Sequence, residues 1–242
     1  MVTALALRAV RHRFGGQSAL AGFDIDVAAG EVVALVGLNG AGKTTALRVL
    51  AGRLRPDAGS AAVLGHDPVG LPASAGRYFG QFLGAPLAYR ELTVRENLVA
   101  AGRLHGLNRA GAAEAAETAI ELFLLAGWAG RAAGTLSAGN WQRLGVACAT
   151  LHAPRALILD EPTNALDPAG VVIVRDVIHA LAASGAGVLV SSHHLDEVSR
   201  IADRIVVVHG GRVVGALAPG DTELERRFFA MVLDADTRQR AA

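Results

Sequence analysis

A glycine-rich segment constrains the fold of this chain more than any other feature. The segment Gly37–Thr45 (GLNGAGKTT) matches the pattern G-x-x-x-x-G-K-[ST]. It follows an apolar run, Glu31–Val36, that is typical of a buried strand, and it opens an apolar helical pattern, Thr44–Leu50. A strand, a glycine loop and a helix in this order predict an α/β fold that binds phosphate at the end of a strand of a parallel sheet.

Each residue type in this loop has a physical reason to be there. Glycines let successive backbone N–H groups turn inward around phosphates, and the helix that follows adds its positive N-terminal end. Lys43 is the only lysine among 23 basic residues, and its compact ammonium is expected to reach the terminal phosphates of a nucleoside triphosphate. The Thr44 hydroxyl is expected to bind Mg²⁺. The predicted phosphate contacts are Gly37, Leu38, Asn39, Gly40, Ala41, Gly42, Lys43, Thr44 and Thr45.

Two adjacent carboxylates follow a second apolar strand, Ala156–Asp160. Asp160 at the end of this strand can hold Mg²⁺ through water, and Glu161 can accept a proton from the attacking water. A GTPase would need an Asn-Lys-x-Asp segment to read guanine. The only lysine is already in the phosphate loop, so a GTPase is excluded.

Composition excludes several other classes of protein. The chain is 52% apolar and 19% charged, which excludes general disorder, and a net charge of +1 makes nucleic acid a poor partner. Cys148 is the single cysteine and lies in an apolar run, so we expect a buried thiol in a reducing compartment. No run approaches 18 apolar residues, and the first residues lack the charge order of a signal peptide, so the expected location is cytoplasmic.

Apolar runs and helical spacing outline the domain organisation. Further parallel strands are predicted at Gly187–Ser191 and Arg204–His209. Four less continuous runs are assigned to an antiparallel sheet or an edge: Thr3–Val10, Phe23–Val27, Ser60–Leu64 and Arg212–Ala218. A helical subdomain is predicted as an insertion at about 82–152, within one nucleotide-binding domain at 1–220. A helix and tail, 221–242, are expected to follow, with the part after Leu233 frayed.

Several linked motifs resemble the nucleotide-binding subunits of ABC transporters, from about Leu5 to Leu217. Leu136–Asn140 (LSAGN) resembles the signature sequence of the family, although Ala138 and Asn140 replace the commoner glycine and glutamine. Asn164–Asp167 resembles the D-loop, which in the family runs along a dimer seam. Val188–His193 resembles the strand that leads to the switch histidine.

The resemblance implies roles for individual residues. Ser137 and Gly139 would contact the phosphate of a nucleotide bound to a second chain, and His193, rather than His194, would contact the γ-phosphate and orient water. Gln81 would sense Mg²⁺ and link it to the helical subdomain, with an ordinary polar loop residue as the alternative. Phe14 would stack on adenine. Trp141 is as consistent with a core residue as with an interface residue.

Taken together, the resemblance implies an ATPase subunit that binds ATP and Mg²⁺. Two chains, either identical or related, would meet head to tail around ATP and drive separate membrane permease subunits, with no nucleic acid involved. The chain would then be peripheral on the inner face of the membrane. Residues 92–98 and 164–170 look most like exporters of the multidrug and antibiotic-resistance branch. A non-transport ABC ATPase that acts as an ATP-switched binding or assembly module stays as the alternative.

Overall fold

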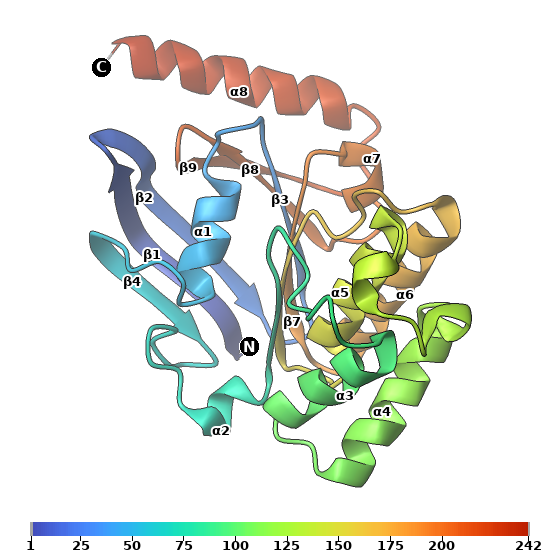
Figure 1. The fold of residues 1–242 in the computed structure, drawn as a ribbon. Coiled ribbons are helices and arrows are strands. Elements are labelled where there is room, and N and C mark those ends of the chain that lie inside the picture. The colour runs from blue at the N-terminus through green and yellow to red at the C-terminus, as the bar shows by residue number, and fades with distance from the viewer. Residues whose placement is uncertain (1, 242) are drawn as a thin grey trace.

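Two β-sheets with a helix between them form the centre of the protein (Figure 1). The computed structural model describes residues 2–241, with side chains for 2–238. The larger sheet has the strand order β5-β6-β7-β3-β8-β9 and is parallel except for its last pair. Its strands are β3 (Val32–Val36), β5 (Phe79–Phe82), β6 (Ala156–Asp160), β7 (Gly187–Ser192), β8 (Arg204–His209) and β9 (Arg212–Leu217).

The three central strands of this sheet, β3, β6 and β7, are buried along their whole length. Continuous apolar runs are what a parallel sheet with both faces covered requires. The carboxyl ends of parallel strands meet at one edge. Val36, Asp160 and Ser192, the last residues of the three strands, therefore lie on one side of the molecule.

The second sheet is antiparallel, with the strand order β2-β1-β4. Its strands are β1 (Thr3–Phe14), β2 (Gln17–Ala28) and β4 (Ala58–Val63). Helix α1 (Lys43–Leu50) lies between the two sheets, and its Leu47 and Leu50 are fully buried in one core cluster with residues of both. The prediction of an antiparallel sheet or an edge is confirmed for all four weaker runs: three form this sheet, and the fourth is β9, an antiparallel edge of the larger sheet.

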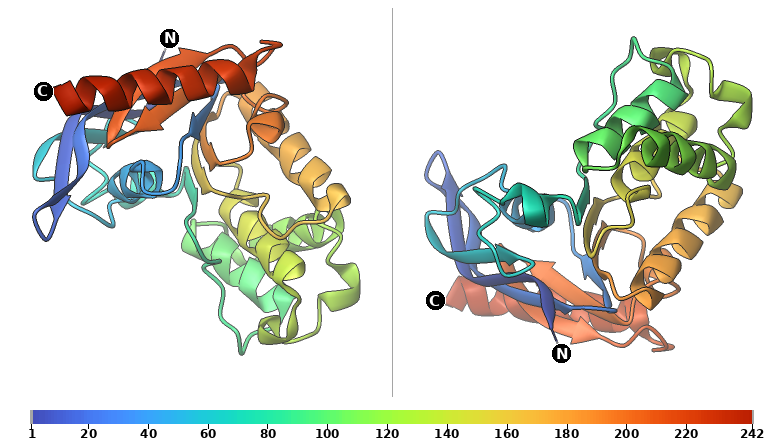
Figure 2. Two further views of the ribbon diagram at one scale, coloured as in Figure 1. Left: turned by 90° about the horizontal axis from the view of Figure 1, so that it is seen from above. Right: turned by 90° about the horizontal axis from the view of Figure 1, so that it is seen from below.

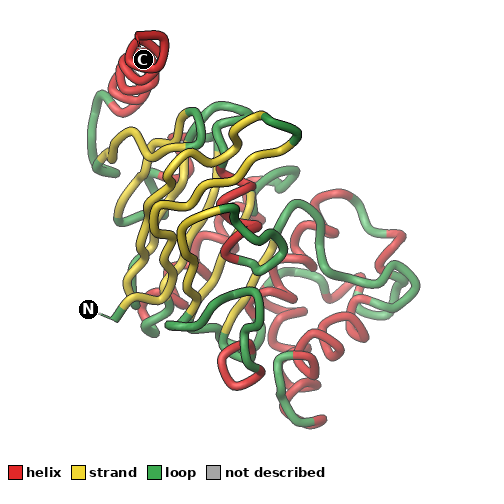
Figure 3. The backbone as a smooth tube through the Cα atoms, turned by 90° about the vertical axis from the view of Figure 1, so that its left-hand side faces the viewer, coloured by secondary structure: helices red, strands yellow, loops and turns green. Residues whose placement is uncertain are grey.

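A group of helices lies to one side of the strands (Figures 2 and 3). It contains α3 (Val94–Leu104), α4 (Arg109–Leu122), two short 3₁₀ turns (Ala126–Trp128 and Ala133–Thr135) and α5 (Ala138–Thr150). Each helix begins at a polar cap. Thr93 and Glu96 form a reciprocal capping box on α3, Asn108 caps α4 and Ser137 caps α5.

Three of the remaining helices pack on the larger sheet: α6 (Pro168–Ala183), α7 (Leu195–Val198) and α8 (Leu224–Ala241). The short helix α2 (Ala73–Gly76) precedes β5. Helix α8 packs on β8 and β9 and crosses the top of the molecule in Figure 1. Within the described chain, no helix combines the length and the apolar character that crossing a membrane requires.

Two expectations from the sequence differ from the structure. Phe79–Phe82 forms an edge strand, β5, that was not predicted. The tail after Leu233 is helical to Ala241, where fraying was expected, because Asp236 accepts a hydrogen bond from His209 of β8 at 2.7 Å and Asp234 pairs with Arg238.

Candidate nucleotide site

The phosphate loop connects the end of β3 to the start of α1, as the sequence predicts. Gly42 caps α1 with a left-handed φ of 110°, and a Cβ at this position would lie 2.8 Å from the carbonyl oxygen of Ala19. A Cβ at Gly37 would lie 2.3 Å from the carbonyl oxygen of Val208. Glycine is therefore required at both ends of the loop. The first-turn N–H groups of α1 have no partner within the helix and are available to an anion.

Lys43 reaches back over this loop. Its Nζ donates to the carbonyl oxygen of Gly37 at 2.6 Å, and the residue is only 8% exposed. Burial lowers the pKa of Lys43, and the nearby carboxylates of Glu161 and Asp160 act in the opposite direction. A buried ammonium whose protein hydrogen bonds go to loop carbonyls can exchange them for phosphate oxygens.

Three oxygen-bearing side chains converge between β6, β7 and α1. Thr44 Oγ1 lies 3.4 Å from Asp160 Oδ1, and Ser191 donates a short hydrogen bond to the same oxygen. Asp160 is 6% exposed and Ser191 is fully buried. A hydroxyl and a carboxylate are hard oxygen ligands of the kind that Mg²⁺ prefers, so Thr44 and Asp160 fit a magnesium site beside the loop.

Glu161 occupies an unusual backbone position at the end of β6. Its φ is 51°, in the left-handed region that residues other than glycine seldom adopt. Its Oε2 lies 2.8 Å from Nδ1 of His193, and its N–H donates to both the carbonyl and the hydroxyl oxygen of Ser191. The acidic side chain is thus held next to the histidine and beside the phosphate loop.

A cleft of about 350 Å³ connects these elements. It is lined by the phosphate loop from Asn39 to Thr45 and by Glu161, Asn164 and His193. The His194 ring lies tilted against that of His193, with 3.8 Å between ring centroids. It lines a neighbouring cavity, which His193 also borders, but not this cleft. Of the two histidines, His193 is therefore the one that lines the cleft beside the phosphate loop.

Phe14 ends β1 and is 47% exposed, as a ring that stacks on a base must be. The edge of the His12 ring packs on it at 4.6 Å between centroids. Asp57 holds this strand end, because its carboxylate accepts from the backbone N–H of Arg13 at 2.9 Å and lies 3.3 Å from His12 Nδ1. Phe14 stays the predicted adenine contact.

Gln81 lies on β5 and does not line the phosphate cleft. It borders a smaller cavity of about 90 Å³ between β5, α3 and α5, and its buried Oε1 has no hydrogen-bond partner in the structure. An unpaired buried acceptor is costly, so this amide is available for a further donor or ligand. Its predicted roles toward Mg²⁺ and the helical subdomain stay predictions.

The signature segment begins helix α5. Ser137 is exposed and caps the helix by accepting from the N–H of Asn140. Gly139 packs against the D-loop of its own chain, where a Cβ would lie 2.9 Å from the Ala165 carbonyl oxygen. Neither residue lines the phosphate cleft of its own chain. Trp141 is half-buried, packing against the core and facing Arg90.

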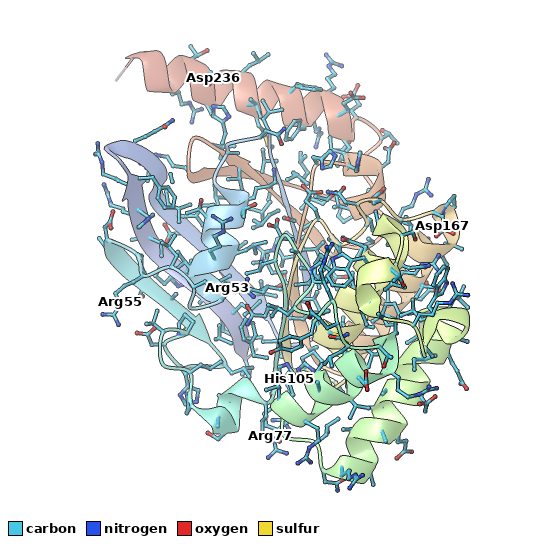
Figure 4. All side chains as sticks on the ribbon, in the orientation of Figure 1. Arg53, Arg55, Arg77, His105, Asp167 and Asp236 are labelled. Carbon is cyan, nitrogen blue, oxygen red and sulfur yellow. The ribbon has the colours of Figure 1, made fainter. Side chains whose placement is uncertain are left out.

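Sequence reasoning missed three side chains that hold this region together. Ser191 fixes Asp160, as described above. Gln142 Nε2 donates to the carbonyl oxygen of Glu161 at 2.9 Å. Arg143, 8% exposed, donates to Asp167 where α6 begins (Figure 4), and this contact lowers the pKa of Asp167, with further help from the N–H of Gly170. For Gln142 and Arg143, the only available signal was their position just after the signature segment, and for Ser191 it was its position on the strand that leads to His193.

Comparison with known proteins places this geometry in a family. The family model described as "ABC transporter" matches residues 20–164. The daunorubicin resistance ATP-binding protein DrrA3 of Streptomyces coeruleorubidus is 42% identical over 213 residues, which are 88% of this chain and 67% of that protein. The bacitracin transport ATP-binding protein BcrA of Bacillus licheniformis is 34% identical over 88% of this chain and 69% of its own length. The DrrA protein of Streptomyces peucetius is 40% identical, and the alignment covers 63% of it.

Solved structures agree with the sequence comparison. A structure described as the ATP-binding subunit of an ABC transporter is 30% identical and superposes with a TM-score of 0.84 over 99% of this chain and all of its own. A nucleotide-free ATP-binding cassette from an ABC transporter superposes with a TM-score of 0.76 at 25% identity, over 94% of this chain and 95% of its own. The mixed α/β fold predicted from the phosphate loop is thereby confirmed.

Proposed function

The chain belongs to the ATP-binding subunits of the ABC transporter family, which are ATPases, and from that premise we propose how its own residues bind and hydrolyse ATP. One observation carries the proposal. Five side chains from separate parts of the chain meet at the carboxyl ends of β3, β6 and β7: Lys43, Thr44, Asp160, Glu161 and His193.

The residues divide the work between binding and chemistry. The loop N–H groups and Lys43 bind the β- and γ-phosphates of ATP, and Thr44 and Asp160 hold Mg²⁺. Bound Mg²⁺ would supply charge neutralisation at the phosphates. Glu161 takes the proton from the attacking water, and His193, held by Glu161 through Nδ1, presents its other ring nitrogen to the γ-phosphate. Phe14 stacks on adenine.

Two chains complete each site. The exposed Ser137 and the neighbouring Gly139 lie outside the cleft of their own chain, so they are free to contact ATP bound to a second copy. ATP would close such a dimer and hydrolysis would reopen it. The second chain is either identical or a related ATPase subunit.

Transport would require separate membrane permease subunits, which place this chain on the inner face of the membrane. The relatives named for daunorubicin resistance and for bacitracin transport, together with a Nod factor export ATP-binding protein from Burkholderia lata, favour export as the direction. They give no support to the alternative of a non-transport ATPase.

The test of catalysis is Glu161→Gln. We expect ATP affinity to stay within about twofold of the parent and hydrolysis to fall by at least ~100-fold, because only the general base is lost. Size-exclusion chromatography with ATP should then show accumulation of the dimer. Turnover close to that of the parent would contradict the assignment of Glu161 as the base.

The test of site sharing mixes two damaged chains. Lys43→Ala disables a phosphate loop, and Ser137→Asp keeps the α5 cap while it places a negative charge where the partner's phosphate would lie. Gly139→Asp is less suitable, because its Cβ would displace Ala165 of the same chain. Asn108→Asp, the same kind of change at the cap of α4, is the matched control.

Each damaged homodimer should be inactive, whereas a doubly tagged heterodimer carries both lesions in one site and none in the other. We expect this heterodimer to recover part of the ATPase activity. Activity in the Ser137→Asp homodimer equal to that of the Asn108→Asp control would contradict site sharing.

A further inference from the structure

The backbone at Glu161 is held from both sides. A residue other than glycine in the left-handed region costs roughly 1–3 kcal/mol and persists only where its surroundings fix it. The N–H of Glu161 donates to the carbonyl and hydroxyl oxygens of Ser191, each at 3.1 Å. The carbonyl oxygen accepts from Nε2 of Gln142 at 2.9 Å. The direction of the Glu161 side chain therefore depends on two residues outside its own segment.

The hydrogen bond of Gln142 is one of several contacts between helix α5 and the segment that follows β6. It is half-buried on helix α5 and faces the segment that follows β6. The next residue, Arg143, donates to Asp167 at the far end of that segment, and Gly139 approaches Ala165 in its middle. Helix α5 thus packs along the whole of residues 161–167 and contacts both ends by hydrogen bonds.

We propose that Gln142 is a positioning residue for Glu161. Its amide donor fixes the carbonyl of the strained residue and so keeps the Glu161 carboxylate beside His193 and the phosphate loop. This inference rests on the function proposed above, in which Glu161 is the base. Gln142 does not line the phosphate cleft of its own chain.

Gln142 and the signature residue Ser137 lie on the same helix, α5. It lies five residues after Ser137, which is about 7.5 Å along the helix axis. The helix that presents Ser137 to the partner's nucleotide therefore also holds the base of its own chain's site.

The experiment removes the donor and keeps the shape. Gln142→Met has nearly the same length and no donor, and we expect kcat to fall about 5- to 30-fold, the effect of losing one hydrogen bond to a partly buried carbonyl. KM and ATP affinity should stay within about twofold. Gln142→Glu also lacks the donor and should lose at least as much, which separates the missing bond from the altered shape.

Thr150→Val is the matched control. It removes a side-chain donor to a backbone carbonyl of the same helix, since Thr150 Oγ1 donates to Val146 at 2.8 Å, but it does not contact Glu161. Its kcat should match that of the parent. Thermal unfolding of all variants reports whether each is folded.

A double-mutant comparison distinguishes positioning of Glu161 from a general structural role. In the Glu161→Gln background, Gln142→Met should change the single-turnover rate by less than about twofold, because the group it positions is already gone. ATP-driven dimerisation of the double variant should equal that of Glu161→Gln alone, because Ser137 is undisturbed.

Each outcome has a definite reading. A kcat of Gln142→Met within twofold of the parent would overturn the inference. So would a 5- to 30-fold fall in the single-turnover rate when Gln142→Met is added to Glu161→Gln, or weaker ATP-driven dimerisation of that double variant than of Glu161→Gln alone. A parent protein with no ATPase activity would instead overturn the proposed function, so the two failures are distinguishable.

Discussion

Stability should fall steeply in mild acid because of a buried histidine pair far from the nucleotide cleft. His152, just after α5, is 8% exposed, and neither ring nitrogen has a hydrogen-bond partner in the structure. Its ring stacks on that of His105, at the end of α3 (Figure 4), with centroids 3.6 Å apart and planes 1° from parallel. Burial, with a further contribution from His105, lowers the pKa of His152 from 6.5 to about 3.

The sign and size of the effect follow from proton binding. Below pH 6.5 the unfolded chain binds a proton at His152, whereas the folded chain does not until about pH 3. The unfolded state is therefore favoured increasingly as the pH falls, by about 1.4 kcal/mol per pH unit and about 5 kcal/mol in total across that window. Above pH 6.5 both states are neutral at this residue and the effect vanishes.

The assay is the free energy of unfolding in urea, measured without nucleotide from pH 7 to pH 4. His152→Phe keeps an aromatic ring against His105. As the pH falls, its free energy of unfolding should decrease with a slope that is about 1.4 kcal/mol per pH unit smaller than that of the parent. His66→Phe, at an exposed histidine, should follow the parent curve. Parallel curves for His152→Phe and the parent would refute the reasoning.

Three further outcomes are expected. Lys43→Arg should lose most ATP affinity in a binding titration, because the planar guanidinium does not fit where the ammonium bonds to Gly37; parent-like affinity would contradict this. Asp167→Ala should lower the free energy of unfolding, since it removes the α6 cap and leaves the buried Arg143 unpaired, and Asp167→Asn should lose less. Cys148, with a pKa raised to about 12 by burial, should resist an aromatic disulfide reagent at pH 8 until urea unfolds the chain, and rapid reaction in the folded state would exclude its burial.

The elements that the sequence predicted best are those whose signal is local. The strands Ala156–Asp160 and Arg204–His209 have the predicted bounds, because a continuous apolar run between polar ends is sufficient to define a buried strand. The phosphate loop was predictable for the same reason, since both its glycines and its lysine lie in one short segment.

The strand β5 was missed because its own sequence contains a misleading residue. Gly80 lies in its middle and reads as a turn, but the structure requires glycine there because α5 approaches closely: a Cβ would lie 2.2 Å from the carbonyl oxygen of Ala149. The end of α8 was misread for a related reason. Its anchor, His209, lies on a strand far away in sequence.

In the candidate site, the residues with proposed catalytic or metal-binding roles were predictable from the sequence. The residues that fix their positions by hydrogen bonds were not. Asp160 and Glu161 stand out as a carboxylate pair after a strand. Gln142 bonds to a backbone carbonyl, and every residue has one, so the sequence does not indicate this contact. Ser191 bonds to Asp160 through its hydroxyl, but a serine in a strand does not by itself indicate such a contact.

The left-handed backbone at Glu161 has a consequence for attempts to make this protein more heat-resistant. Glycine adopts that conformation without penalty, so Glu161→Gly would relieve strain of about 1 kcal/mol at this position. A selection or a design method that rewards folding alone would therefore favour glycine at the position where we propose the catalytic carboxylate. Stabilising this protein while keeping the proposed base means leaving the strained Glu161 as it is and improving the chain elsewhere.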